Sequence, residues 1–279
     1  MTFTHFSKNG QILPVEQATV SLFNIEYSYG YGVYETLKVR SGIVYFVEQH
    51  LERLEHSAKI IKLVHPYTKE NIKTYIQELI KQHGNIQACN IKLLLIGAGK
   101  REDVQLYIFL SAPLFPDRKL YSQGAKTITN NYQRIFPQAK TLNMLGSYLA
   151  YKKALEQDCY DALLIDENKH ILEGTRTNFF AIKNNILFTP PTEKVLEGVT
   201  RMTVMAVAKN HGFTIEETDI KFSELNKYDG FFITSTSTKI IPLRQINDIL
   251  FESIPENVKK LMKQYDTFLD ESKGIFLSP

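Results

Sequence analysis

Two charged side chains, Lys140 and Glu173, have residue types and neighbours that could support catalysis. Lys140 lies between the apolar-aromatic stretch RIFPQ and the apolar stretch LNMLGSYLA, which predicts partial burial. Burial disfavours the ammonium form of a lysine and frees a neutral, nucleophilic amine. Glu173 opens the segment EGTRTNFF, and a carboxylate buried among strand ends needs a cationic partner or hydrogen-bond donors. The ordinary alternatives are a solvated surface lysine and a turn glutamate in a surface ion pair.

Three further segments offer donors suited to a phosphate. In EGVTRMT, Thr200 lies in the first turn of a predicted helix, whose free N–H groups favour an anion. The segment TSTSTK, Thr234 to Lys239, follows the apolar strand GFFI and adds hydroxyls, Thr236 among them. Arg53 in HLERLEHSA is a bidentate donor. Each has an ordinary alternative: an N-cap threonine, a serine/threonine turn, and a charge pair on a solvated helix face. An amine, an acid and phosphate donors together make up the inventory of a pyridoxal phosphate site.

Periodicity predicts the elements that must position these residues. The pattern indicates a strand at Ile43–Phe46 that leads into a helix, and buried strands at NIKLLLIG and VQLYIFL. Further helices are predicted over 69–81, 145–157 and 199–211, the last closed by Gly212. YDALLIDENKHIL and FFAIKNNILFT are predicted as hairpins, with turns at 166–168 and 184–185. The sequence SAPLFPDRKL is interpreted as an interdomain link, which divides the chain into 1–113, 114–120 and 121–279.

Composition excludes several other classes of function. A formal charge of +3 without a clustered Lys/Arg run does not favour nucleic acid as a partner. The apolar stretches are too short to span a membrane, and the N-terminus lacks the layout of a secretory signal. Cys89 and Cys159 are far apart and lack the spacing of a zinc site, so no metal is expected. We therefore expect a soluble cytoplasmic protein with one or two α/β domains.

A long segment of the chain resembles the signature of the class IV, fold type IV, pyridoxal phosphate-dependent aminotransferases. It reads EGTRTNFFAIKNNILFTPPTEKVLEGVTR, from Glu173 to Arg201, and each position of the signature is filled. YGYGVYETLKV, QHLERLEHSA, AKTLNMLGSYLAYKKA and FFITSTSTKIIPL extend the resemblance over nearly the whole chain. The resemblance implies a small N-terminal α/β domain and a larger C-terminal α/β domain with a β-barrel-like core. The C-terminal domain is the one expected to bind the cofactor.

The resemblance also implies a role for single residues. Lys140 corresponds to the catalytic lysine that carries pyridoxal 5'-phosphate, and Glu173 to the partner of the cofactor's ring nitrogen. Phosphate ligands are expected at Arg53, at Thr200 and Thr236, and at the backbone of Val199. Tyr34 in GVYE matches a tyrosine of the substrate pocket, and Ser237 and Arg176 are further expected substrate residues.

The family contains enzymes of different substrates, and local likeness favours a D-amino acid aminotransferase. LNMLGSYLA, CYDALL and TSTSTKIIPL have counterparts there, whereas branched-chain enzymes usually have a tyrosine where this chain has Met144. Aminodeoxychorismate lyases often have Asn-Ser or Asn-Ala in place of Ser235-Thr236. A branched-chain L-amino acid aminotransferase and the lyase, which releases 4-aminobenzoate and pyruvate, stay open as alternatives. So does a non-catalytic protein that binds a phosphorylated ligand, although retention of both Lys140 and Glu173 argues against it.

One departure from the D-amino acid enzymes concerns the substrate carboxylate. The loop GAGKREDV lacks the Arg-x-His motif that binds this group in the well-known members. Arg176 is a candidate anchor in its place, with Lys100 and Arg101 as other candidates. A cap of the strand mouth and a pair with a surface acid are the ordinary alternatives for Arg176. The expected partners are an amino acid and a 2-oxo acid. A homodimer is also expected, in which the segment from Ser28 to Tyr31 reaches the neighbouring subunit's pocket.

Overall fold

The chain forms two compact units, each with its own sheet and core. The computed structural model describes residues 3–84, 86–113, 116–272 and 275–276, the last two by their backbone. Unit 1 comprises Met1–Leu114, Ala139–Met144 and Ser272–Pro279, and unit 2 comprises Phe115–Gln138 and Leu145–Glu271. Of the expected link 114–120, residues 114 and 115 lie outside the described residues, and helix α4 begins at Arg118.

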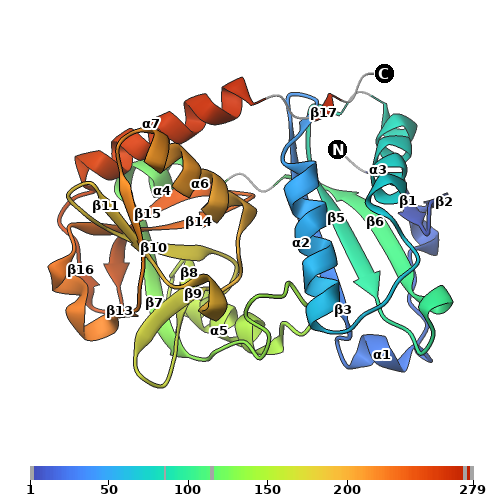
Figure 1. The fold of residues 1–279 in the computed structure, drawn as a ribbon, viewed down its shortest axis with the longest axis horizontal. Helices are drawn as coiled ribbons and strands as arrows, with labels where there is room; N and C mark the ends of the chain where they lie inside the picture. Colours follow the sequence, from blue (N-terminus) through green and yellow to red (C-terminus); the bar gives the residue numbers. More distant parts are fainter. Residues whose placement is uncertain (1–2, 85, 114–115, 273–274, 277–279) are drawn as a thin grey trace. The chain divides into compact units, whose positions relative to one another are not determined.

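Unit 1 is built on a seven-stranded sheet with the order β17-β4-β3-β5-β6-β1-β2 (Figure 1). Its strands are β1 (His5–Lys8), β2 (Gln11–Pro14), β3 (Gly32–Arg40), β4 (Ile43–Val44), β5 (Ala88–Ile96), β6 (Gln105–Ser111) and β17 (Ile275–Phe276). Its helices are η1 (Val15–Gln17), α1 (Ile25–Ser28), α2 (Val47–Ile60), α3 (Lys69–His83) and η2 (Arg101–Asp103).

Helices α2 and α3 cover one face of this sheet. Leu51 and Leu54 of α2 and Ile72 of α3 share a buried cluster with Leu37 of β3 and Leu93 of β5. Side chains alternate between the faces of a strand, so the odd-numbered residues of β3 from Val33 to Val39 face α2 and the even-numbered ones face the opposite side. This alternation directs Glu35 towards α2 and Tyr34 away from it.

Unit 2 is built on a ten-stranded sheet with the path β12-β11-β10-β14-β15-β7-β8-β9-β13, and β16 pairs with β15. Its strands are β7 (Ala125–Asn131), β8 (Asp161–Ile165), β9 (His170–Gly174), β10 (Asn178–Lys183), β11 (Ile186–Thr189), β12 (Thr214–Glu217), β13 (Ile220–Lys221), β14 (Gly230–Ser235), β15 (Lys239–Ile246) and β16 (Ile249–Leu250). Its helices are α4 (Arg118–Gln123), α5 (Leu145–Glu156), η3 (Thr192–Lys194), α6 (Val199–Asn210), η4 (Phe222–Lys227) and α7 (Glu256–Glu271).

A closed barrel forms the centre of unit 2. Strand β10 pairs with both β14 and β9, so β10, β14, β15, β7, β8 and β9 make a six-stranded ring. Phe179 and Phe231 from neighbouring strands stack at 5.7 Å between ring centroids in one buried cluster. Phe180 and Phe232, on the other face of the same strands, stack at 4.8 Å. The expected α/β class and barrel-like core of the C-terminal part are therefore confirmed.

Most elements expected from periodicity are present with shifted ends. Helices α3, α5 and α6 and the two hairpins β8–β9 and β10–β11 match their expected positions. The strand expected to reach Phe46 stops at Val44, because Phe46 adopts a left-handed conformation (φ 55°) at the start of α2. Helix α7 has no counterpart among the elements that the sequence predicts. It packs on α6, where the hydroxyls of Tyr265 and Thr203 are hydrogen-bonded at 3.0 Å.

Candidate active site

Lys140 is held by unit 1, although the chain on both sides of residues 139–144 belongs to unit 2. Its carbonyl accepts the N–H of Tyr34 at 2.9 Å, and Thr141 forms an antiparallel bridge with Val33. The N–H of Lys140 donates to Oγ of the buried Ser57 at 3.1 Å. Residues 140–142 thus run as a short added strand along β3, which fixes the backbone from which the amine extends.

The amine of Lys140 lies over the ring of Tyr34. Nζ is 4.4 Å from the ring centroid and has no hydrogen bond or ion pair with any residue that the structure describes. The side chain is half-buried, as expected. The hydroxyl of Tyr34 points to Sδ of Met144 at 3.7 Å, so Tyr34 and Lys140 lie together.

Arg53 belongs to a buried charged cluster of unit 1. Its Nε and Nη2 donate to the two oxygens of Glu35 at 2.7 and 2.8 Å, and Glu35 is fully buried. Burial alone raises the pKa of Glu35, but Arg53 and His50 together hold it far below its ordinary value. Arg53 is therefore buried and pairs with Glu35 of β3, so it does not lie on a solvated helix face as the ordinary alternative supposed.

His50 completes this cluster as a neutral donor. Burial lowers its pKa despite the opposing effect of Glu35. A carboxylate only accepts hydrogen bonds, so the proton must lie on Nδ1, which donates to Glu35 at 2.7 Å. Among the described residues, Nε2 of His50 is buried without a partner. A buried unsatisfied nitrogen of this kind is a feature of ligand sites.

Glu173 of unit 2 is also buried and paired, at the end of β9. Arg134 donates to its Oε1 through Nε at 2.9 Å and through Nη2. Its other oxygen accepts the N–H of Leu196 at 3.3 Å. Glu173 is therefore not a solvated turn residue, and its cationic partner in the protein is an arginine that sequence reasoning did not identify.

The EGTRTN segment is joined directly to the start of α6. The amide of Asn178 donates to the carbonyl of Leu196 at 2.7 Å. A Cβ on Gly198, the N-cap of α6, would lie 2.0 Å from Oδ1 of Asn178, so glycine is required there. The helix begins with no side-chain cap, which leaves its first N–H groups without a side-chain acceptor beside the buried Thr200. Glu173, Val199 and Thr200 are thus brought together in unit 2.

The TSTSTK segment joins the same region through the sheet. Thr234 pairs with Asn178 across β14 and β10, and its buried Oγ1 has no partner among the described residues. The loop that follows is closed by a 2.7 Å bond between the hydroxyls of Ser235 and Thr238, with the half-buried Thr236 and Ser237 between them. An uncapped helix start with neighbouring hydroxyls and an orphaned threonine fits the phosphate of a cofactor.

Arg176 is exposed, and its guanidinium carbon lies 3.9 Å from the centroid of the Tyr151 ring on α5. The described part of the chain places no carboxylate within ion-pairing distance of this guanidinium. Its charge is therefore available to a ligand carboxylate, while the ring holds the planar group in place.

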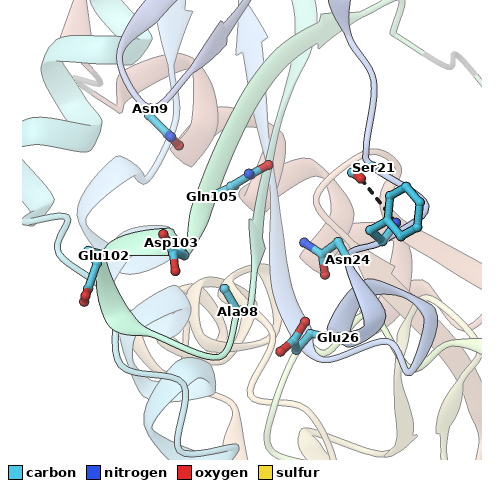
Figure 2. A pocket seen from close by; sticks show the side chains of 9 residues that line it. Asn9, Ser21, Asn24, Glu26, Ala98, Glu102, Asp103 and Gln105 are labelled. Atoms are coloured by element: carbon cyan, nitrogen blue, oxygen red, sulfur yellow. Dashed lines mark hydrogen bonds between the residues drawn. The ribbon is translucent and has the colours of Figure 1, made fainter.

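A separate hollow of about 460 Å³ opens on unit 1 (Figure 2). Its lining includes Asn24, Glu26, Glu102, Asp103 and Gln105, and none of the predicted site residues. The described residues contain no group of three or more His, Cys, Asp or Glu that could hold a metal ion. Nor does any helix in the described part of the chain have the length and apolar character needed to cross a membrane.

The sequence did not predict the side chains that bond to Arg53, to Glu173 and to the EGTRTN segment. One signal was available for Glu35, because it stands at a position of β3 that alternation directs into an apolar layer. Arg134 and Asp161, which contacts the EGTRTN segment, offered no comparable local signal, since both partnerships depend on how distant segments meet.

The sequence of the chain is similar to those of known aminotransferases. Residues 32–246 match the family model described as "Amino-transferase class IV". The chain is 31% identical over 271 residues to a putative branched-chain-amino-acid aminotransferase of Methanocaldococcus jannaschii, covering 92% of this chain and 93% of that protein. It is 30% identical over 253 residues to a D-alanine aminotransferase of Listeria monocytogenes, covering 86% and 87% of the two chains.

Solved structures share the fold at lower identity. The branched-chain amino acid aminotransferase of Escherichia coli matches with a TM-score of 0.86 and 23% identity over 100% of both chains. Another branched-chain amino acid aminotransferase, solved with pyridoxamine 5'-phosphate, matches with a TM-score of 0.87 and 22% identity over 95% and 93% of the chains. Class IV aminotransferases use pyridoxal phosphate. With a family match over most of its length and relatives at this level of identity, the chain belongs to the class IV aminotransferases.

Proposed function

We propose that this protein transfers the amino group of a D-amino acid to a 2-oxo acid, with pyridoxal 5'-phosphate as its cofactor. The observation that supports a substrate carboxylate is the exposed guanidinium of Arg176 over Tyr151, which has no carboxylate partner among the described residues. The choice of a D-amino acid rests on the local likeness of LNMLGSYLA, CYDALL and TSTSTKIIPL to the D-amino acid enzymes. The relatives act on two substrate classes, since one is named a D-alanine and another a branched-chain-amino-acid aminotransferase. The branched-chain L-amino acid reaction is therefore the second candidate.

The cofactor residues fall into two groups, one in each unit. In unit 1, Lys140 would carry the cofactor covalently and Arg53, oriented by Glu35, would bind its phosphate. In unit 2, Glu173 would accept a hydrogen bond from the N–H of the cofactor ring, and Thr200, Thr236 and the N–H of Val199 would bind phosphate oxygens. When bound, the cofactor supplies an electron sink for the substrate's Cα once its proton is removed.

The remaining chemistry is done by the protein's own side chains. The free amine of Lys140 would take the proton from the substrate's Cα and would deliver it to the cofactor carbon on the other side of the transferred nitrogen. The ring of Tyr34, 4.4 Å from Nζ, limits the positions that this amine can adopt. Arg176 holds the substrate carboxylate, with Ser237 and Tyr34 as further substrate contacts.

Two observations support a homodimer. On α5, four apolar side chains are half or more exposed: Leu145 (67%), Tyr148 (57%), Leu149 (55%) and Leu155 (50%). In unit 1, Leu22 and Phe23 are each 98% exposed, close in sequence to Ser28–Tyr31. Apolar residues grouped in this way mark interaction surfaces, and a second copy in the cytoplasm is the occupant that we propose.

The first experiment is a spectroscopic titration of the cofactor-loaded protein with D-alanine, D-glutamate and L-leucine in turn. A D-amino acid should abolish the visible band of the bound cofactor, and the matching 2-oxo acid should restore it. A response to L-leucine alone would replace the proposal with the branched-chain reaction. If none of the three changes the band, a transaminase of these substrates is excluded and aminodeoxychorismate becomes the compound to test.

A further inference from the structure

Asp161 is the most deeply buried carboxylate of unit 2 that the proposed reaction does not use. It is the first residue of β8 and has no exposed surface. Oδ1 accepts the N–H of Ala162 at 2.9 Å and the N–H of Thr175 at 3.2 Å. The hydroxyl of Thr175 also donates to Oδ1, and that of Thr177 donates to Oδ2 at 3.0 Å.

These bonds are directed at one short loop. Thr175 and Thr177 lie on either side of Arg176, and Glu173 lies just before them at the end of β9. A backbone bond from the N–H of Gly174 to the carbonyl of Thr177, 2.8 Å long, closes the same turn. A Cβ on Gly174 would lie 2.6 Å from Oδ2 of Asp161 and 2.1 Å from Oγ1 of Thr177, so this arrangement of hydrogen bonds requires a glycine there.

Burying a carboxylate in this way has a cost. Burial raises the pKa of Asp161, while the two threonine hydroxyls, the N–H of Ala162 and the charge of Arg176 act in the opposite direction. Such a carboxylate is tolerated where donors offset its desolvation, and three of the four donors to Asp161 belong to Thr175 and Thr177. The loop that these bonds hold carries two proposed functional residues, Arg176 and Glu173.

We propose that Asp161 is the positioning residue of the EGTRTN loop: by binding both threonine hydroxyls it fixes the backbone around Arg176 and the start of the loop at Glu173. Asp161 touches neither substrate nor cofactor and acts through these two side chains. The inference rests on the proposed function for the roles of Arg176 and Glu173, but the geometry of the loop is independent of it.

The test compares a double variant with its conservative counterpart. Thr175→Val/Thr177→Val removes both hydroxyls and keeps the side-chain shape, whereas Thr175→Ser/Thr177→Ser keeps the hydroxyls. Asp161→Asn is a milder variant, because Oδ1 keeps its donors and only the acceptor for Thr177 is lost. Asp166→Asn is the matched control, since Asp166 follows the other end of β8 and bonds the N–H of His170 at 2.8 Å in the hairpin.

Three quantities are measured well below the unfolding temperature of each full-length variant. They are hydrogen exchange of the amides of residues 174–178 without cofactor, the dissociation constant for pyridoxal phosphate, and KM for the amino donor. In the valine variant we expect faster exchange confined to this loop, and increases of about tenfold to a hundredfold in the dissociation constant and KM. The serine variant and Asp166→Asn should stay near the wild type, with Asp161→Asn between them and the valine variant.

A purely structural role predicts a different result. It would lower the melting temperature of the valine variant while loop exchange, cofactor affinity and KM stayed unchanged, and that result would overturn the inference. An equal loss in Asp166→Asn would overturn it as well. If the valine variant does not fold, the exchange data on Asp161→Asn decide. A wild-type protein that binds no pyridoxal phosphate would refute the proposed function. Hydrogen exchange of residues 174–178 in the cofactor-free variants would still test whether Asp161 positions the loop.

Discussion

Arg134 donates twice to one oxygen of Glu173, Oε1, and leaves the other oxygen, Oε2, with only the 3.3 Å bond from the N–H of Leu196. The carboxylate is thus fixed from one side by a cation and keeps accepting capacity on the other. A ring N–H of a cofactor needs such an acceptor. The same geometry also explains how a carboxylate with 5% exposure is tolerated at the end of a buried strand.

Glu173→Gln should therefore retain the cofactor but lower kcat by about a hundredfold or more, because the amide carries no charge to stabilise a protonated ring nitrogen. The visible spectrum of the loaded variant and its steady-state kinetics check this. Arg134→Gln, which keeps Glu173 but removes its cation, should have a smaller effect in the same direction. Unchanged kinetics in both variants would return Glu173 to the role of a structural turn residue.

Lys140→Ala should abolish transamination while the protein stays folded, because the backbone bonds of residue 140 to Tyr34 and Ser57 do not depend on its side chain. Turnover and circular dichroism give the two readouts. Lys153→Ala on the exposed side of α5 is the control for removing one lysine. Substantial residual turnover in Lys140→Ala would show that another group carries the cofactor.

Arg176→Gln should raise KM for the amino donor by about tenfold to a hundredfold with a smaller change in kcat, since it removes a charged hydrogen-bond donor to a carboxylate. The comparison is with Arg101→Gln and Lys100→Gln, the other candidates for this role. If the larger effect on KM falls on either of those variants, the carboxylate anchor lies in the 97–104 loop instead.

Glu35→Gln should destabilise the protein by about 3–5 kcal/mol at neutral pH, because Arg53 loses its buried counter-charge and the neutral His50 loses its carboxylate acceptor. The pKa of Glu35 in the folded protein lies below its ordinary value of 4.5. Its contribution is therefore complete above about pH 4.5 and is lost as the pH falls further towards the folded-state pKa.

Urea unfolding of wild type and Glu35→Gln at several pH values measures this difference. The gap between the two free energies of unfolding should be constant from neutral pH to about pH 4.5 and shrink below it. A gap that widens on acidification would contradict the sign of the shift.

Leu149→Glu should weaken the proposed dimer, because it adds a charge to the exposed apolar face of α5. Light scattering across a range of protein concentrations gives the mass. Lys183→Glu, at an exposed lysine at the end of β10, is the control for a charge reversal away from this helix. A fully active wild-type monomer would exclude the dimer.

The segments with local signals were found from sequence, and the contacts that orient them were not. Glycines, hydroxyls and helix or strand boundaries can be recognised within a few residues in EGTRTN, LEGVT and TSTSTK. The bonds of Glu173 to Arg134, of Arg53 to Glu35 and of Asp161 to Thr175 join segments that periodicity treats separately. Periodicity gives the face on which a residue lies, but the identity of the side chain opposite depends on how strands and helices are arranged. In unit 2 that arrangement includes the closure of the barrel by β10 and β9.

The return of residues 139–144 to unit 1 has a consequence for protein engineering. A recombinant hybrid that exchanged only the first 113 residues with a relative would import Tyr34, Arg53 and their neighbours, yet leave Lys140 on the recipient's own sequence. The short strand that lies along β3 would then belong to one parent and β3 itself to the other. A functional hybrid should therefore take residues 1–113 and 139–144 from the same parent. A single crossover point cannot achieve this without also transferring the segment between them.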